Sequence, residues 1–333
     1  MDFQPTEDQK ALRDGIRSFC EGQIPNERIP DLEKSKGFDR GLWTELAEMG
    51  VFALRVPEKD EGIGLGYSEA VLVFEELGRR LVPGPLVWSH LAAGRIPGAA
   101  SGERVVGGLD LHGGIDEATT PILVEHFESL DVLLVLRPEG LFELDPRDLD
   151  AKEVDIPLDP LTPVHSIDSL PRGEEIGDAE ASARMRLEGA ALVSGQLLGL
   201  AEGALDLANE YAKTREQFGR PIGGFQAVKH LLAEMFVRQE AARAGAYNAG
   251  ATLDAPEVGD VERAVSSAKL TAGEGAIRNA RGCIQVHGGM GFTWEVLAHY
   301  YFKRAWVLEN VFGTQDEHAE RIAGILEKPG SGS

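Results

Sequence analysis

The stretch that decides the fold is YAKTREQFGRPIGGFQAVKH, residues 211–230. On its upstream side, residues 187–208 are apolar on nearly every face of a helix, which is typical of a buried helix. On its downstream side, apolar residues between 228 and 235 recur at three- and four-residue spacing, which predicts a second helix with one apolar face. The stretch therefore predicts a connection between two long helices.

The connection itself contains helix breakers and an arginine. Gly219, Pro221 and the adjacent Gly223 and Gly224 interrupt a helix and let the backbone approach a ligand closely. Arg215 lies near the end of the upstream helix, where the helix dipole favours a cation. A guanidinium at this place can also hold a phosphate through two hydrogen bonds. From the residues alone, Arg215 is either a dipole-matched loop residue or a phosphate ligand.

The sequence from Arg215 to Ile222, followed by residues 225–230, resembles a signature of the acyl-CoA dehydrogenase family. In that family this loop reaches across a subunit interface to the pyrophosphate and adenosine part of the flavin. The resemblance implies that the cofactor is FAD. It also implies that four residues of the loop contact this cofactor: Arg215, Gln217, Phe218 and Gln226.

A second stretch, RGCIQVHGGMGF at residues 281–292, resembles another signature of that family. There, a Gln-x-x-Gly-Gly turn meets the diphosphate region of the flavin from the neighbouring subunit, which implies roles for Gln285, Gly288 and Gly289. Taken by itself, the turn is a helix C-cap, because both glycines suit a left-handed conformation. The two interpretations are compatible, since exposed backbone N–H groups in such a turn bind anions. His287 receives no role.

Composition and charge narrow the class of protein. The 333 residues are 43% apolar and 26% charged, as in a soluble globular protein with a sizeable core. The net charge of −22 argues against nucleic-acid binding and against a basic membrane-binding patch. We find no signal peptide and no apolar run approaching the roughly 18 residues of a membrane span, so we expect a cytoplasmic protein. Cys20 and Cys283 are too few for a disulfide framework or a metal site.

Three parts of the chain differ in pattern. Residues 1–100 show helical periodicity, and residues 101–185 contain short apolar runs separated by Gly, Pro and Asp clusters, which predicts strands. Residues 186–328 return to helical periodicity, and residues 329–333 are expected to form a flexible tail. The predicted fold class is α+β and mostly α. It has an N-terminal helical domain, a small β domain and a C-terminal four-helix bundle, which is the order of parts in acyl-CoA dehydrogenases.

The predicted β domain departs from the family pattern. It contains neither a Thr-Glu-Pro-x-x-Gly-Ser-Asp-like stretch nor a Trp-x-Thr-Asn-like stretch. In typical members those segments cover the flavin ring. The comparison with the family therefore implies a shortened β domain that cannot cradle a flavin ring alone.

The residue that the family uses as catalytic base is also replaced. Residues 312–314 align with the Glu-Gly-Thr tripeptide, in which the glutamate removes the α-proton of the acyl thioester. Thr314 stays a candidate flavin contact, but Phe312 cannot accept a proton. Some members carry the glutamate on the helix that corresponds to residues 187–208, where the register places a glycine. Glu188 is one residue away, about 100° around the helix, so we expect it to be an exposed first-turn residue.

A degenerate flavin-ring domain and an absent base occur here together with two intact flavin-contact loops. This combination is similar to the shorter chain of α2β2 acyl-CoA dehydrogenases from bacterial degradation of steroids and bulky acyl-CoA thioesters. In those enzymes a longer chain carries the base and most of the flavin site. The resemblance implies an acyl-CoA substrate, a longer partner chain of the same family and an electron-transfer flavoprotein as acceptor.

Three hypotheses follow for the function. In the first, the chain is a dehydrogenase subunit that acts only with a partner chain. In the second, it is a self-sufficient flavin dehydrogenase that uses Glu188 or another carboxylate as base. In the third, it is a non-catalytic binding or scaffold protein. We favour the first, because a scaffold has no need of both the arginine loop and the Gln-Gly-Gly turn.

Overall fold

The computed structural model describes residues 5–112 and 121–327. By its internal contacts the chain divides into two compact units, each of which combines segments that are distant in sequence. One unit comprises Met1–Glu21, Val71–Val82 and Ala190–Ser333, and the other comprises Gly22–Ala70 and Pro83–Gly189. The domain boundaries expected near residues 100 and 185 stay a prediction.

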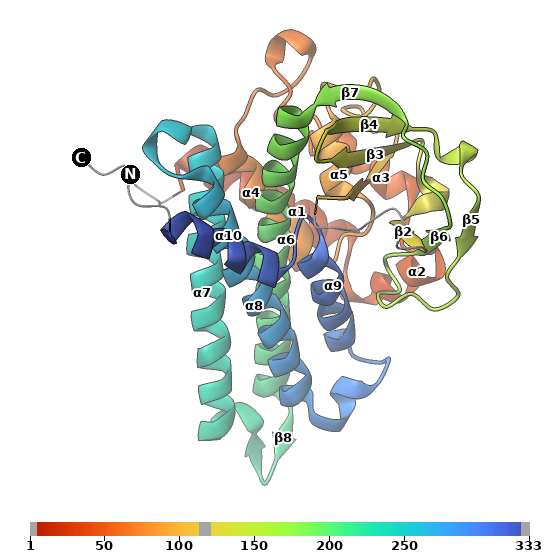
Figure 1. The fold of residues 1–333 in the computed structure, drawn as a ribbon. Coiled ribbons are helices and arrows are strands. Elements are labelled where there is room, and N and C mark those ends of the chain that lie inside the picture. The colour runs from red at the N-terminus through yellow and green to blue at the C-terminus, as the bar shows by residue number, and fades with distance from the viewer. Residues whose placement is uncertain (1–4, 113–120, 328–333) are drawn as a thin grey trace. The chain divides into compact units, whose positions relative to one another are not determined.

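The first part of the described chain contains five α-helices (Figure 1). They are α1 (Glu7–Gln23), α2 (Ile29–Lys34), α3 (Arg40–Glu48), α4 (Tyr67–Arg79) and α5 (Leu86–Ala92). A capping box begins α1: the Gln9 N–H donates to Thr6 Oγ1 at 3.2 Å, and the Thr6 N–H donates to Gln9 Oε1 at 2.9 Å. Asp39 caps α3 by accepting from the Leu42 N–H at 3.0 Å. These side chains satisfy N–H groups that a helix start otherwise leaves unpaired.

The middle of the chain forms two small sheets in the residues that the structure describes. The first has the order β1-β3-β4-β7, built from β1 (Val106–Asp110), β3 (Val132–Arg137), β4 (Gly140–Leu144) and β7 (Glu174–Asp178). In it β1 and β3 are parallel, and the other neighbours are antiparallel. The second sheet is antiparallel, with the order β2-β6-β5, built from β2 (Ile122–Glu125), β6 (Val164–Ile167) and β5 (Ala151–Glu153).

The sequence predicted four of these strands from their apolar runs and missed three. Strand β3 is buried along its whole length, so its aliphatic run is a strong signal. Strands β5 and β7 are mostly exposed and rich in charged residues, so they carry no alternating apolar pattern. Strand β6 was missed as well: it is only four residues long and carries a histidine and a serine.

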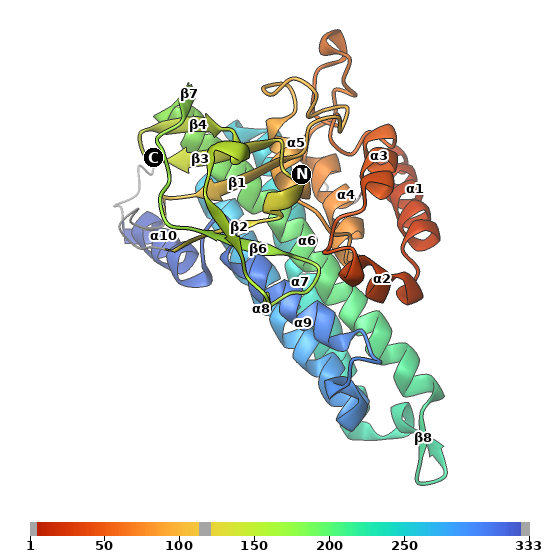
Figure 2. The same ribbon diagram turned by 90° about the vertical axis from the view of Figure 1, so that its right-hand side faces the viewer.

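A bundle of long helices forms the C-terminal part (Figures 1 and 2). Four helices run side by side and a fifth follows: α6 (Ala179–Thr214), α7 (Gln226–Asp254), α8 (Val261–His287), α9 (Ala298–Asn310) and α10 (Gln315–Glu327). The hairpin of β8 (Glu216–Gln217) and β9 (Arg220–Pro221) joins α6 to α7 at one end of the bundle. Small residues allow close packing: a Cβ at Gly245 of α7 would lie 2.6 Å from Thr271 Oγ1 of α8.

This architecture confirms the predicted fold class, with helices before and after a small β part and a bundle at the C-terminal side. Cys20 and Cys283 are both buried and free, and burial raises the pKa of each thiol to about 12. Unreactive, packed thiols of this kind behave as small apolar residues. The predicted flexible tail lies outside the described residues.

Helix α6 is long and apolar enough to cross a membrane, with a mean hydropathy of 1.2 in its most apolar 18-residue window. The sequence analysis predicted that no apolar run approaches the length of a membrane span, and this prediction was wrong. Most charged residues of α6 lie toward its two ends, which leaves a long apolar stretch between them. In the structure 83% of the window is buried inside the protein, as in the core helix of a globular fold.

Candidate functional site

The hairpin after α6 is held by backbone hydrogen bonds. The helix ends one residue before Arg215, whose N–H still donates to Tyr211 O at 2.8 Å. The Ile222 N–H donates to Arg215 O at 2.8 Å and closes the hairpin. Phe218 and Gly219 make the turn with positive φ values of 52° and 79°. The helix therefore ends within the connection that the breaker residues predicted.

Side chains on this hairpin are exposed and have few partners. Arg215 is exposed. No described residue accepts a hydrogen bond from its guanidinium or forms an ion pair with it. Gln217 Nε2 donates to Glu216 O at 2.7 Å, and Phe218 is 91% exposed. Gln226, the first residue of α7, is exposed as well. The hairpin thus presents an unpaired cation, an amide and an aromatic ring at its surface.

The glycine turn lies at the same end of the bundle (Figure 1). Helix α8 ends at His287, and Gly288 follows with a φ of 59°. A Cβ placed at Gly288 or at Gly289 would meet no atom within 4 Å, so the space in front of both residues is open. Gln285 is exposed. The turn is the helix C-cap that the sequence predicted, with its backbone accessible to a ligand.

Two stacked rings join the hairpin to the glycine turn. The ring centroids of Tyr211 and His287 are 4.2 Å apart, and the ring planes are inclined by 25°. The structure therefore brings together seven of the eight residues that the resemblance assigns to flavin binding: Arg215, Gln217, Phe218, Gln226, Gln285, Gly288 and Gly289. We call the surface formed by residues 211–226 and 285–294 the bundle end.

The bundle end also carries exposed aromatic residues that the sequence reasoning did not single out. Phe292 is 84% exposed and Trp294 is 65% exposed. Lys303 Nζ lies 4.2 Å from the centre of the Trp294 ring system. The sequence contained a hint of this exposure, since both aromatic residues follow the glycine turn in a stretch without helical periodicity. Aromatic residues are enriched at protein interfaces.

Thr314, the eighth candidate, lies away from the bundle end. Helix α9 separates it from the glycine turn, and its 13 residues span about 20 Å. Its N–H donates to Glu317 Oε2 at 2.7 Å, and its Oγ1 accepts from the Glu317 N–H at 3.2 Å. These two bonds form a capping box at the start of α10. Within one chain, Thr314 and the bundle end do not form one site.

Phe312, which the family resemblance aligns with the position of the base, is buried in the structure. It is 1% exposed and has a positive φ of 57°, which is unusual for a bulky residue. Its carbonyl oxygen lies 3.1 Å from His318 Nε2, which therefore donates to it. Glu309, one turn earlier, accepts from the Gln315 N–H at 3.0 Å and is part of the local structure. An aromatic ring buried here can pack but cannot take a proton.

A buried lysine fixes the backbone before Phe312. Lys269 is 1% exposed, and its Nζ donates to three carbonyl oxygens at the end of α9, those of Leu308, Glu309 and Val311, at 3.1, 3.1 and 2.8 Å. Carbonyl groups at and just after a helix end lack the N–H partners four residues on that the helix interior has. The ammonium group therefore satisfies them and complements the helix dipole.

Replacing Lys269 with methionine is expected to lower the free energy of unfolding by roughly 2–4 kcal/mol, because several buried carbonyl groups lose a charged donor. Urea unfolding followed by circular dichroism measures this change. Lys229→Met is the matched control on the exposed surface of α7, where we expect a change within about 0.5 kcal/mol. Equal losses for the two variants would contradict this role of Lys269.

Glu188 was expected to be an exposed first-turn residue, and this prediction is wrong. Helix α6 begins at Ala179, where Asp178 Oδ1 accepts from the Ala181 N–H at 2.9 Å, so Glu188 lies in the third turn. Its exposure is 9%. The first turns of α6 are polar, so the apolar pattern placed the start of the helix several residues too far along the chain.

Two arginines surround the Glu188 carboxylate. Arg184 Nε donates to Glu188 Oε1 at 2.8 Å, and Arg55 Nη2 lies 3.9 Å from the same oxygen. The Arg55 guanidinium carbon is 3.3 Å from the centre of the Tyr67 ring. A partly buried carboxylate with two cationic neighbours is typical of a structural ion cluster. This geometry does not single Glu188 out as a base.

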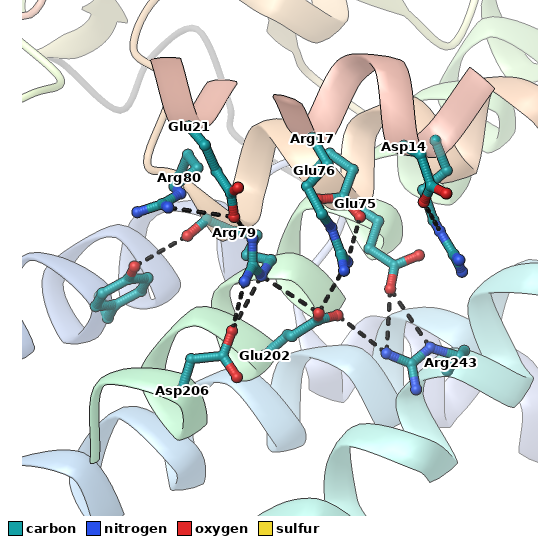
Figure 3. A network of polar contacts seen from close by, with 12 residues as sticks. Asp14, Arg17, Glu21, Glu75, Glu76, Arg79, Arg80, Glu202, Asp206 and Arg243 are labelled. Carbon is teal, nitrogen blue, oxygen red and sulfur yellow. Dashed lines mark hydrogen bonds and ion pairs between the residues drawn. The ribbon is translucent and has the colours of Figure 1, made fainter. Parts of the chain in front are cut away.

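A network of partly buried ion pairs links α1, α4, α6 and α7 (Figure 3). Arg17 donates to both oxygens of Glu76, from Nε at 2.9 Å and from Nη2 at 2.7 Å, and to Glu202 Oε1 at 3.0 Å. Arg243 Nη2 lies 3.3 Å from Glu75 Oε1 and 3.0 Å from Glu202 Oε2. The sequence analysis did not identify any of these pairs.

The same network lines a cavity of about 590 Å³. Glu75 is 1% exposed, and burial raises the pKa of its carboxyl to about 7 although Arg243 opposes the shift. Burial likewise raises the pKa of Glu76. Tyr247 donates from its hydroxyl to Glu75 Oε2 at 2.7 Å. Because each carboxylate has a cationic or hydroxyl partner, we interpret the network as structural.

In the described ranges, no group of three or more His, Cys, Asp or Glu residues could hold a metal ion. The chemistry available at the bundle end is the binding of an anion. It combines the guanidinium of Arg215 with an open glycine turn, and both groups recognise phosphate. The chain as a whole carries a net charge of −22. Arg215 is therefore a local cation on an acidic protein and not part of a general basic surface.

Comparisons with known proteins agree with the residue patterns. The model of the acyl-CoA dehydrogenase N-terminal domain matches residues 6–101, and that of the C-terminal domain matches residues 182–326. Acyl-CoA dehydrogenase IpdE2 of Mycobacterium tuberculosis is 33% identical over 90% of this chain and 92% of its own length. Acyl-CoA dehydrogenase FadE34 of the same organism is 31% identical over 97% of this chain, which spans only 48% of that protein.

Solved structures share the fold. The crystal structure of the ChsE4–ChsE5 complex from Mycobacterium tuberculosis matches with a TM-score of 0.85 and 24% identity, over 99% of this chain and 100% of the matched chain. A variant of the Tcur3481–Tcur3483 steroid ACAD matches with a TM-score of 0.83 and 25% identity, over 96% of this chain and 98% of the matched chain. Both structures cover this chain nearly from end to end.

Proposed function

The chain belongs to the acyl-CoA dehydrogenase family of FAD-dependent oxidoreductases, and we propose from this premise that it is one subunit of a heteromeric acyl-CoA dehydrogenase. The assembled enzyme removes hydrogen from the α- and β-carbons of an acyl-CoA thioester. A longer partner chain of the same family supplies the catalytic base and most of the flavin site. This chain completes that flavin site with its bundle end.

One observation carries the proposal: the two stretches that resemble flavin loops are exposed, whereas a buried phenylalanine, Phe312, stands at the position that the resemblance assigns to the base. α,β-Dehydrogenation needs a base within hydrogen-bonding reach of the α-carbon proton, and a phenylalanine cannot fill that role. A chain with flavin loops and no base is best explained as half of a shared site.

The residues of the bundle end fit the diphosphate of FAD. The Arg215 guanidinium has no ion-pair partner among the described residues and can donate two hydrogen bonds to a phosphate. The open turn at Gly288 and Gly289 can offer backbone N–H groups to the same anion. When bound, FAD supplies a ring that accepts the hydride from the β-carbon of the thioester. This chain would bind and orient the other end of the cofactor.

The names of similar proteins support a partner chain and an electron acceptor. The ChsE4–ChsE5 structure is named as a complex. CarC of Acetobacterium woodii, 24% identical over 97% of this chain, is named as a subunit of a caffeyl-CoA reductase–Etf complex. We accordingly propose a longer acyl-CoA dehydrogenase-like chain as the partner and an electron-transfer flavoprotein as the acceptor.

Co-expression with a longer acyl-CoA dehydrogenase-like chain tests the proposal, with flavin absorbance of each purified species as the readout. We expect the isolated chain to be pale and the complex to contain FAD. Stoichiometric FAD in the isolated chain would favour a self-sufficient enzyme. A folded complex without FAD would favour a scaffold protein.

The self-sufficient alternative makes Glu188 the base, and its two arginine neighbours count against that role. We expect Glu188→Gln to leave the turnover of the complex, normalised to bound FAD, within about twofold, since loss of a general base typically costs 10²–10⁴-fold. Glu309→Gln is the companion variant, and we expect the same result. A loss of a hundredfold or more in either variant would identify that glutamate as the base.

A further inference from the structure

His287 has no role in the flavin-binding proposal, yet it lies between the two loops that carry it. The residue is 6% exposed and directly precedes Gly288. Its ring stacks on the ring of Tyr211, with 4.2 Å between the centroids and 25° between the planes. The two residues belong to different helices, α8 and α6, and both lie in the last turn before a flavin loop.

We propose that the Tyr211–His287 stack is a positioning device that sets the separation between the arginine hairpin and the glycine turn, so that both reach the same diphosphate. This inference rests on the proposed function of the bundle end. It assigns neither residue a direct contact with the cofactor. Both residues act through the backbone that follows them.

The link from Tyr211 to the hairpin is a short one. Its carbonyl oxygen accepts from the Arg215 N–H at 2.8 Å, so the tyrosine and the arginine share one helical turn. The hairpin also packs on α6, since a Cβ at Gly223 would lie 2.9 Å from Ala212 O. A displacement of the Tyr211 end of α6 would therefore carry the Arg215 backbone with it.

The link from His287 to the glycine turn is equally direct. His287 Nδ1 lies 2.8 Å from Cys283 O, and because a carbonyl only accepts, Nδ1 carries the proton. Burial lowers the pKa of His287, so the ring is neutral near pH 7. The turn packs back on α8, since a Cβ at Gly291 would lie 2.6 Å from Ile284 O. The ring is thus held in one tautomer and one orientation on Tyr211.

Affinity for FAD in the complex with the longer chain tests the inference. Tyr211→Ala and His287→Ala are each expected to weaken FAD binding by roughly 2- to 10-fold, the factor that corresponds to one stacked aromatic pair. Tyr211→Phe and His287→Phe keep a ring in place and are expected to stay within about twofold of the wild type. Alanine variants that bind FAD like the wild type would overturn the inference.

Leu198→Ala separates positioning from general destabilisation. Leu198 is 0% exposed in the middle of α6, so its truncation should lower the melting temperature at least as much as the ring variants do. It touches neither loop, and we expect unchanged FAD affinity in protein that is still folded. If Leu198→Ala weakens FAD binding as much as His287→Ala, the stack has no specific positioning role.

Two further results separate this inference from the proposed function. If Arg215→Ala loses FAD affinity and the ring variants do not, only the positioning inference fails. If the wild-type complex binds no FAD, the proposed function fails and the inference falls with it. Hydrogen exchange on the isolated chain adds a readout without cofactor: Tyr211→Ala should speed exchange at residues 288–292, and unchanged exchange there would contradict the stack as a fixing contact.

Discussion

Replacing Arg243 with methionine is expected to lower the free energy of unfolding by about 3–5 kcal/mol at about pH 8, because two buried carboxylates lose the cation they share. Its Nη2 lies 3.3 Å from Glu75 Oε1 and 3.0 Å from Glu202 Oε2. Glu75 is 1% exposed, so its carboxylate depends on protein groups more than on bulk water for its stabilisation. Urea unfolding measures the loss.

The matched control for Arg243→Met is Arg278→Met. Arg278 pairs with Glu274 at 3.0 Å on the surface of α8, with both side chains more than half exposed. Exposed pairs of this kind contribute about 0–1 kcal/mol. If the two arginine variants lose the same free energy of unfolding, burial does not strengthen the contribution of the network to stability.

The pH dependence of this loss follows from Glu75. Burial raises the pKa of its carboxyl from 4.5 to about 7 in the folded protein. A carboxyl with a raised folded-state pKa contributes stability that is fully present below its unfolded pKa and is lost as the pH rises through the folded pKa. We therefore expect the deficit of Arg243→Met to shrink as the pH falls from about 8 to about 5.

Glu75→Gln tests this assignment. The amide keeps the size of the side chain and an oxygen that can accept from the Tyr247 hydroxyl, now at 2.7 Å from Glu75 Oε2. We expect the variant to be at least as stable as the wild type at about pH 8 and to recover part of the Arg243→Met loss in the double variant. No recovery, or a loss that is the same at both pH values, would contradict the role of Glu75.

Arg215→Ala is expected to lower the FAD affinity of the assembled complex by about tenfold or more. The removed interaction is a charge-assisted, two-point contact with a phosphate, which contributes roughly 1.5–3 kcal/mol. Because Arg215 is exposed and unpaired in the described chain, its removal should leave the melting temperature of the isolated chain unchanged. Equilibrium titration of the apo-complex with FAD measures the affinity.

Two variants sharpen the Arg215 experiment. Arg215→Lys keeps the charge and loses the planar two-point geometry, so we expect an intermediate affinity. Arg263→Ala removes an exposed arginine in the first turn of α8, at the end opposite the glycine turn, and should have no effect. If Arg215→Ala binds FAD like Arg263→Ala, Arg215 is a dipole-matched structural residue.

Local patterns in the sequence predicted the parts of the molecule that depend on neighbouring residues. The break between α6 and α7 and the C-cap at Gly288 each follow from residues a few positions apart. The replacement of the base by Phe312, inferred from the neighbouring Gly313 and Thr314, stays a prediction. The prediction that Glu188 is an exposed first-turn residue was wrong because α6 begins with polar residues, where no apolar periodicity marks the helix.

Contacts between distant segments could not be predicted in this way. Glu75 and Arg243 are 168 positions apart, and nothing in either helix indicates its partner. Tyr211 and His287 likewise lie at the ends of different helices, and His287 had received no role before the structure placed it on Tyr211. Such pairs depend on how the helices pack, which is a property of the whole core.

The most direct test of the shared-site proposal is the turnover of the isolated chain, supplied with excess FAD, on a range of acyl-CoA thioesters. We expect no dehydrogenation at an enzyme-like rate, because the family resemblance aligns Phe312 with the base and the sequence contains no stretch like those that cover the flavin ring in the family. Addition of the longer chain should restore turnover. Turnover by the isolated wild-type chain that Glu188→Gln abolishes would contradict the shared-site proposal and establish a self-sufficient enzyme.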